Sequence, residues 1–203
     1  MKVSIDAPKP APLNTAGMVS LPGNVKDYTM CVDPGITGTG IAIFPDLTRK
    51  WKSVRRPTRA FLLPLPDEQH KIDWILKAEW YADMFEQAIR VVSVISTCYI
   101  EMPVLWDSGR SHAAASQGDL FKLSYLVGEY ANVLRRTWFL RPNLLSPGEW
   151  KGQLPKKVVS QRIHRALGRV YGNHIDDAVG MGLYLQGWTT KKFWTKVKEG
   201  KVK

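Results

Sequence analysis

The sequence predicts an α/β domain with a mixed β-sheet. Three observations carry this prediction. Two strand-like apolar runs flank a glycine-rich turn, a long segment with helical periodicity follows at 72–95, and further strands and helices then alternate along the chain. The order is three strands, a helix, a strand, a helix, a strand and two helices, which is typical of an α/β domain. An apolar content of 44% is enough for a hydrophobic core.

The N-terminal half of the domain begins with a hairpin. Strands are expected at 28–32 and 39–44, because the glycines between them allow a tight turn. Residues 49–56 are a candidate third strand with one basic face, and residues 57–67, with three prolines, are expected to be a loop. Apolar side chains recur along one helical face at 72–95, which predicts a helix there.

The C-terminal half alternates strands with helices. Its expected elements, in order, are a strand at 98–101, a helix at 116–136, a strand at 138–145, a turn at 147–152, a basic helix at 155–168 that begins with proline, and a last helix at 173–186 capped by Asn173. We find no internal repeat and no second domain. Residues 27–188 are expected to fold as one domain.

Both ends of the chain differ from the domain in composition. Residues 1–26 are rich in Pro, Ala, Gly, Ser and Asn and show no periodicity, so we expect a flexible N-terminal arm. Residues 189–203 contain six Lys and one Glu, which predicts a basic C-terminal tail. Within it, residues 191–203 are interpreted as a flexible electrostatic arm.

The charge of the chain points to a polyanionic partner. The net charge is +11 and the sequence pI is about 9.7, which favours nucleic acid, with an anionic membrane or an acidic protein as the main competitor. A basic protein without such a partner is the remaining alternative. Cys31 and Cys98 lie in apolar runs and are expected to be buried thiols, not a disulfide or a zinc site. With no signal-like or membrane-spanning stretch, we expect a cytoplasmic protein and no membrane partner.

Four residues of the types that bind metal ions lie at the ends of predicted strands or at the start of a predicted helix. Asp33 ends the first strand, and Glu101 ends the strand after the first long helix. If those strands are adjacent and parallel, both carboxylates emerge at the same sheet end. His174 and Asp177 open the last helix three residues apart and therefore share a face, whereas Asp176 is turned about 100° away.

Carboxylates with one imidazole suit Mg²⁺ or Mn²⁺. Two such ions hold a scissile phosphate and activate a water, so this set on a basic chain points to phosphodiester hydrolysis. Each residue also has an ordinary structural explanation: Asp33 as a turn residue, Glu101 as an ion-pair partner, Asp177 as a complement to the helix dipole, and His174 as a plain first-turn residue.

Four motifs in order resemble the RuvC-like Holliday junction resolvases of the ribonuclease H-like superfamily. They are Asp-Pro-Gly-x-Thr-x-Thr-Gly from Asp33, Tyr-Ile-Glu ending at Glu101, Lys-Leu-x-x-x-x-Gly from Lys122, and His-x-x-Asp-Ala-Val-Gly from His174. The match runs over about 28–188 and implies a ribonuclease H-like mixed β-sheet flanked by helices. The compact domain with appended ends is more similar to the phage-encoded branch, which implies the host cytoplasm as its location.

The resemblance implies a metal-dependent, structure-selective endonuclease on Holliday junctions or other branched DNA. Its catalytic and metal-binding set is Asp33, Glu101, His174 and Asp177, with two Mg²⁺ or Mn²⁺ ions per active site. A nuclease on linear duplex or RNA–DNA hybrid, and a non-catalytic DNA-binding module on the same fold, remain alternatives. Sugar-kinase-like phosphoryl transfer is disfavoured because 203 residues leave no room for a second lobe.

Several basic and aromatic residues are candidate DNA contacts. The cluster before the last helix consists of Lys151, Lys156, Lys157, Arg162, Arg165 and Arg169. We expect it to bind phosphate, with a solvated helix face as the alternative, and Lys156 or Lys157 to meet the scissile phosphate. Trp106, in the loop with Arg110 and His112, is a candidate for stacking on an unpaired base, or else an ordinary core or interface tryptophan.

The family resemblance also implies a homodimer with two active sites. An apolar stripe on the helix at 116–136, formed by Leu123, Leu126, Val127 and Tyr130, is a candidate interface. The alternative is that this stripe packs against its own sheet, and the sequence does not separate the two.

Overall fold

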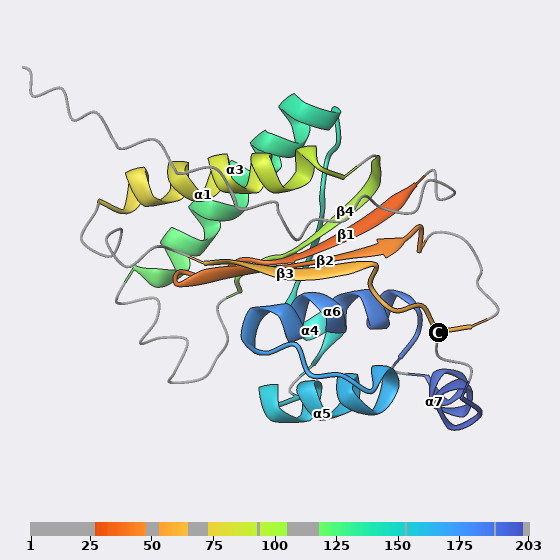
Figure 1. Cartoon of the computed structure of the whole chain (residues 1–203). Helices are drawn as coiled ribbons and strands as arrows, with labels where there is room; N and C mark the ends of the chain where they lie inside the picture. Colours follow the sequence, from red (N-terminus) through yellow and green to blue (C-terminus); the bar gives the residue numbers. More distant parts are fainter. Residues whose placement is uncertain are drawn as a thin grey trace, which may run out of the picture.

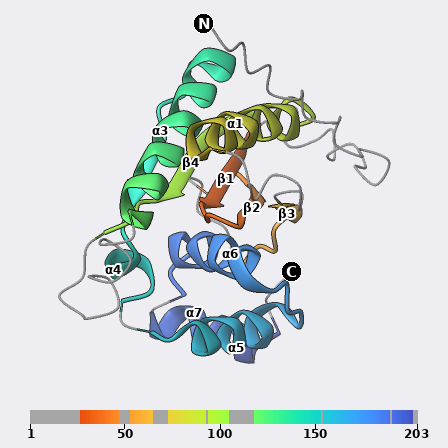
Figure 2. The same cartoon turned by 90° about the vertical axis from the view of Figure 1, so that its left-hand side faces the viewer.

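The sheet of this protein lies between two layers of helices. In the computed structural model, α1 and α3 cover one face of the sheet and α6 covers the other, with α5 and α7 farther out (Figures 1 and 2). The described residues are 27–47, 53–64, 73–92, 94–104, 118–152, 154–188 and 190–200. The α/β class predicted from the sequence is confirmed.

Five strands form a mixed sheet in the order β3-β2-β1-β4-β5. Their bounds are β1 Tyr28–Asp33, β2 Gly38–Pro45, β3 Arg59–Pro64, β4 Ile95–Glu101 and β5 Asn143–Leu145. Strand β2 pairs antiparallel with β1 and β3, whereas β1, β4 and β5 are parallel neighbours. Since parallel strands end at the same sheet edge, the carboxyl ends of β1 and β4 lie side by side.

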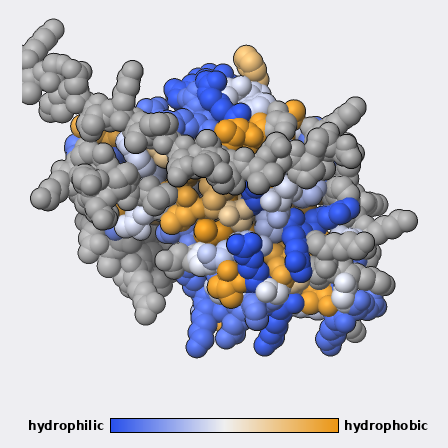
Figure 3. All heavy atoms as spheres, viewed as in Figure 1, coloured by the Kyte–Doolittle hydropathy of each residue, from blue (hydrophilic) through white to orange (hydrophobic). Residues whose placement is uncertain are grey.

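Six labelled helices surround the sheet. They are α1 Trp74–Arg90, α3 Asp119–Trp138, α4 Pro147–Trp150, α5 Lys156–Leu167, α6 Asn173–Leu185 and α7 Lys191–Lys198. Helices α1 and α3 pack on each other, and α6 packs on β1 and β2 with α5 on its far side. The lower edge of the molecule in Figure 3, where α5 lies, is mostly hydrophilic.

The third strand lies later in the chain than predicted. Strand β3 at Arg59–Pro64 falls inside the expected loop, and the described part of the candidate strand at 49–56 has only a bridge at Val54. The loop was predicted because prolines usually interrupt strands. Strand β3 is an edge strand, however, and a proline at its end removes no hydrogen bond from the interior of the sheet. Its Leu63 is buried.

Two elements between α3 and α5 also differ from the prediction. The strand expected at 138–145 shrinks to β5, because α3 continues to Trp138 and ends at Phe139 in a left-handed conformation. The turn expected at 147–152 contains α4. Its capping box joins Ser146 to Glu149, with Pro147 at the first position.

The C-terminal region is more ordered than predicted. Gly172, with φ of 91°, caps α6 in place of Asn173. The flexible arm expected from residue 191 is wrong for Lys191–Lys198, which form α7, capped by the Thr190 hydroxyl. Phe193 is 2% exposed, so an apolar contact holds this basic helix against the domain.

The two faces of the sheet carry separate hydrophobic cores. Phe85 and Tyr130 stack within the core under α1 and α3, with ring centroids 4.4 Å apart. This burial of Tyr130, together with Leu126 and Val127, shows that most of the stripe considered for a dimer packs inside its own domain. The other core, beneath α6, contains Trp150 and its neighbours from α5 to α7.

Both cysteines are buried free thiols, as predicted. Cys31 lies on β1 and Cys98 on β4, in the cores on opposite faces of the sheet. None of the helices in the described ranges is long and apolar enough to cross a membrane.

Candidate active site

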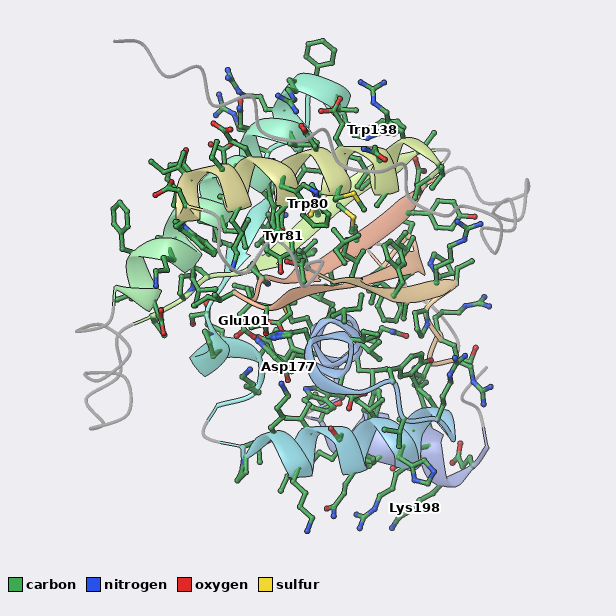
Figure 4. All side chains as sticks on the ribbon, turned by 60° about the vertical axis from the view of Figure 1, so that its left-hand side comes forward. Trp80, Tyr81, Glu101, Trp138, Asp177 and Lys198 are labelled. Carbon is green, nitrogen blue, oxygen red and sulfur yellow. The ribbon has the colours of Figure 1, made fainter. Side chains whose placement is uncertain are left out.

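The predicted carboxylates meet at one edge of the sheet. Val32 and Ile100 are partners in the parallel pairing of β1 with β4, so Asp33 and Glu101 follow them at neighbouring strand ends. Helix α6 begins against the same edge and brings Asp177 toward Glu101 (Figure 4). The adjacent parallel strands that the sequence analysis required are therefore present.

Two glycines of the hairpin make room for the start of α6. A Cβ at Gly40 would lie 2.0 Å from the His174 carbonyl oxygen, and one at Gly35 would lie 2.4 Å from its ring carbon Cε1. Any larger residue would push the helix away from the sheet. The space that the glycines leave before Asp33 is thus filled by His174.

Asp33 and His174 form a short hydrogen bond. Nδ1 of His174 lies 2.6 Å from Oδ2 of Asp33. Asp33 is 4% exposed, whereas about a quarter of the His174 side chain is exposed. The carboxylate therefore orients the imidazole, as carboxylates do for histidines that bind metals.

Glu101 is held by two consecutive residues that end α4. The indole N–H of Trp150 donates to Oε2 of Glu101 at 2.6 Å, and the Lys151 ammonium lies 3.2 Å from the same oxygen. Sequence reasoning missed Trp150, because its segment was interpreted as a turn. The capping-box pattern from Ser146 to Glu149 was the available signal that this tryptophan sits on a fixed helical turn.

Asp177 faces the same ammonium. Its Oδ2 lies 3.5 Å from Nζ of Lys151 and 3.8 Å from Nζ of Lys156. Its other oxygen, Oδ1, is buried and has no hydrogen-bond partner among the described residues. A buried carboxylate oxygen without a partner is costly, and it is suited to accept a cation.

The cluster carries an excess of negative charge. Burial and the nearby Asp33 raise the pKa of Glu101 to about 7, a rise that Lys151 and Trp150 oppose without cancelling. Burial, followed by Asp33, also raises the pKa of Asp177. Burial acts to lower the pKa of Lys151, but the surrounding carboxylates raise it overall.

Asp176 points away from this cluster. Its Oδ2 accepts from the Ser160 hydroxyl at 2.6 Å and its Oδ1 from the Tyr171 backbone N–H at 3.0 Å. The side chain is buried and ties α6 to α5 and to the loop before it. Its separation from Asp177 agrees with the rotation expected from helical geometry.

The donor set fits a hard divalent cation, although its side chains do not converge as a formed centre. Across the described ranges, no group of three or more His, Cys, Asp or Glu side chains is placed to hold a metal ion. His174 is bonded to Asp33, and Lys151 lies between Glu101 and Asp177. The carboxylate oxygens of the cluster outnumber the cations beside them, and Oδ1 of Asp177 has no partner among the described residues. Such oxygen donors suit Mg²⁺ or Mn²⁺.

The basic residues predicted to bind DNA have different environments. Lys156 is half exposed beside the cluster, and Lys157 and Arg165 are exposed on α5. Arg162 instead lies over the rings of Trp188 and Trp194, at 5.8 and 5.9 Å from their centroids. It therefore braces α7 against α5.

Arg169, which was also in the basic cluster, lies 4.9 Å from the Tyr171 ring centroid. The predicted contacts Trp106, Arg110 and His112 lie outside the described residues.

The comparisons with known proteins identify the fold. No family model matches the chain, and no curated protein matches its sequence. Thermus thermophilus RuvC is similar in structure, with a TM-score of 0.57 and 14% identity, over 87% of this chain and 98% of that one. T. thermophilus RuvC in complex with Holliday junction substrate gives 0.56 and 12%, over 80% and 94%.

The chain thus has a RuvC-like α/β fold, as its motifs predicted. Both similar structures come from T. thermophilus, so neither favours the phage-encoded branch.

Proposed function

We propose that this protein is a metal-dependent endonuclease that hydrolyses phosphodiester bonds in branched DNA. The observation that carries the proposal is the carboxylate cluster at the ends of β1 and β4, formed by the buried Asp33 and the largely buried Glu101 and faced by the buried Asp177 from α6, on a chain of net charge +11. Buried acids with raised pKa values in a basic protein are characteristic of a functional site. The RuvC-like fold supports the same reaction class, which this chain would share by analogy.

The proposed metal ligands are Asp33, Glu101, His174 and Asp177. With two Mg²⁺ or Mn²⁺ ions bound, the site would gain an activated water and stabilisation of the leaving oxygen. The chain's own residues orient these ligands: Asp33 holds the His174 ring, and the Trp150 N–H fixes Glu101.

Charge on the reacting phosphate needs a cation beside the cluster. Lys156 is the favoured residue, because it lies 3.8 Å from Asp177 and is still half exposed. Lys157, one residue on, is exposed on α5 and is assigned to the flanking DNA backbone with Arg165. We do not assign Arg162 to DNA binding, because its guanidinium lies over two tryptophan rings.

Branched DNA is the proposed substrate. A Holliday junction is the substrate in the T. thermophilus RuvC complex, whose fold this chain shares. A homodimer with two active sites is proposed on the same basis, although the buried α3 stripe does not supply its interface. We keep residues 27–188 as the nuclease domain, and the phage-encoded branch with a cytoplasmic site of action as part of the proposal.

A cleavage assay on labelled substrates tests this function. Four-way, three-way, flap and linear duplex DNA and an RNA–DNA hybrid are incubated with the protein and Mg²⁺, with and without excess chelator. We expect nicking of the branched forms that chelator abolishes. Preferential cutting of linear duplex or hybrid would assign the alternative nuclease activity, and tight junction binding without cutting would assign a DNA-binding module.

Two isosteric variants connect the activity to the site. Asp33→Asn and Glu101→Gln are expected to abolish cutting and leave junction binding largely intact, because the charge that they remove serves the metal. Asp119→Asn, which removes an acid paired with Lys122 on α3, is the matched control. Full activity of either site variant would contradict the proposed metal site.

A further inference from the structure

Lys151 occupies the centre of the carboxylate cluster. Its Nζ lies 3.3 and 3.2 Å from the two Glu101 oxygens and 3.5 Å from Oδ2 of Asp177. The three side chains are only 19%, 13% and 8% exposed, so solvent screens this contact weakly. Lys156 also reaches Asp177, but from 3.8 Å and with 48% of its side chain exposed.

The backbone of Lys151 is fixed, whereas its side chain is held mainly by charge. Its N–H donates to the Pro147 carbonyl at 3.0 Å, which closes α4. The preceding Trp150 is 1% exposed and stacks on Trp188. The ammonium rests 4.7 Å from the Trp150 ring centroid, within cation–π range. A long flexible side chain on a rigid turn can leave the carboxylates without disturbing the fold.

A divalent ion and this ammonium compete for the same oxygens. An ion held by Glu101 and Asp177 needs close contact with the oxygens that Lys151 now faces, and two cations at that spacing repel each other. We propose that Lys151 is an internal counter-ion that the metal displaces: it holds Glu101 and Asp177 together in the metal-free protein and gives way when an ion binds. This inference rests on the proposed function, because it concerns the same carboxylates.

The proposal predicts opposite changes in two quantities when the lysine is removed. Lys151→Met leaves the carboxylates without their cation, so the metal-free variant is expected to unfold at a lower temperature. The same variant is expected to bind Mn²⁺ on the order of tenfold more tightly, because no ammonium has to be displaced. Calorimetric titration measures the Mn²⁺ affinity, and thermal unfolding in chelator measures the melting temperature of the metal-free protein. Lys198→Met removes an equal charge on α7 and should change neither; Figure 4 shows Lys198 far from Glu101 and Asp177.

A second measurement uses the unmodified protein. Acetylation of Lys151 by an amine-reactive ester, followed by mass spectrometry, is compared in chelator and in saturating Mn²⁺, with Lys198 as the internal reference. We expect Lys151 to react several-fold faster with Mn²⁺, since a displaced ammonium is more accessible and no longer paired. This measurement decides the question alone if Lys151→Met does not fold.

The outcomes separate this inference from the proposed function. Unchanged or weaker Mn²⁺ affinity in Lys151→Met, or unchanged acetylation, would overturn the role of Lys151 while Mg²⁺-dependent cleavage by the unmodified protein still stands. No Mn²⁺ binding by either protein, together with no cleavage, would overturn both.

Discussion

Charged side chains have different environments on the two faces of the sheet. On the face covered by α1 and α3, Glu86 pairs with the exposed Arg90 and Arg136, and the buried contact between Thr39 and Tyr130 joins two neutral hydroxyls. On the face covered by α6, carboxylates are buried where the helix begins against the sheet edge. On the first face the Glu86 carboxylate is paired with two arginines and the buried charged residue is a cation, Lys77 of α1, whereas on the other face several carboxylates are buried close together.

Both faces have a hydrophobic core, so this difference in charge marks only the face that is proposed to act. The two arginines outweigh the burial of Glu86 and lower its pKa, whereas the acids at the other face keep raised pKa values and therefore destabilise the fold when they are charged. Such a cost at one sheet edge is typical of a functional site. Within α6 itself, Asp176 and Asp177 repeat the contrast, since one is fully bonded and the other has an unpartnered oxygen.

The largest expected effect comes from exchanging these two neighbouring acids for amides. Asp177→Asn should slow single-turnover cleavage by on the order of 10³-fold or more, because it removes a proposed ligand. Asp176→Asn should keep the cleavage rate but reduce the folding stability by on the order of 1–3 kcal/mol, through its weakened bonds to Ser160 and Tyr171. Loss of cleavage in Asp176→Asn at unchanged melting temperature would contradict the purely structural role given to Asp176.

The next largest effect separates the two lysines that open α5. Lys156→Ala should slow the cleavage step by on the order of 10²-fold if its ammonium meets charge on the scissile phosphate. Lys157→Ala, one residue away and with no contact to Asp177 shown in the structure, is the matched control and should alter binding only. Single-turnover rates at saturating enzyme measure the difference. Equal slowing in both variants would contradict the assignment of Lys156, and not Lys157, to the scissile phosphate.

The sequence could predict that the side chains of the candidate site lie close together, but not the contacts around them. Asp33 and Glu101 each end an apolar strand, and helical spacing alone separates Asp176 from Asp177. The contacts of Trp150 and Lys151 with Glu101 depend on a four-residue helix and on tertiary packing, which no periodicity reveals.

The ordering of the basic C-terminal segment was missed for a related reason. Lysines dominate its composition, but Phe193 is buried and Arg162 lies over Trp194, so two aromatic contacts outweigh the charge in deciding its structure. Edge strand β3 was likewise hidden by the prolines at its borders.

A smaller effect is the pH dependence of stability that the largely buried Glu101 causes. Burial and Asp33 raise the pKa of Glu101 from 4.5 to about 7 in the metal-free protein. Between these values the folded chain binds more protons than the unfolded chain, so this group's contribution to stability falls as pH rises. The melting temperature of the unmodified protein relative to Glu101→Gln should therefore fall between pH 5 and 8.

Thermal unfolding in metal-free buffers checks this pH dependence. Glu101→Gln is the reference because it cannot titrate, and saturating Mg²⁺ should remove the fall by compensating the charged carboxylate. A difference in melting temperature that rises with pH would contradict the assigned sign.

The smallest effect is expected on the basic outer helix. Removing α7 entirely would expose the core around Phe193 and mix folding with binding, so charge removal is the sharper change. The double variant Lys196→Gln/Lys198→Gln should weaken binding to every DNA form alike and reduce the salt dependence of affinity, by about one unit of log–log slope for each phosphate that is no longer neutralised. The single-turnover cleavage rate should not change, because Lys198 of α7 lies far from Glu101 and Asp177 (Figure 4). Lys196→Arg/Lys198→Arg keeps both charges and should restore binding. Slower cleavage at saturating DNA, with the salt dependence intact, would mean that the outer helix belongs to the site and not to the flanking surface.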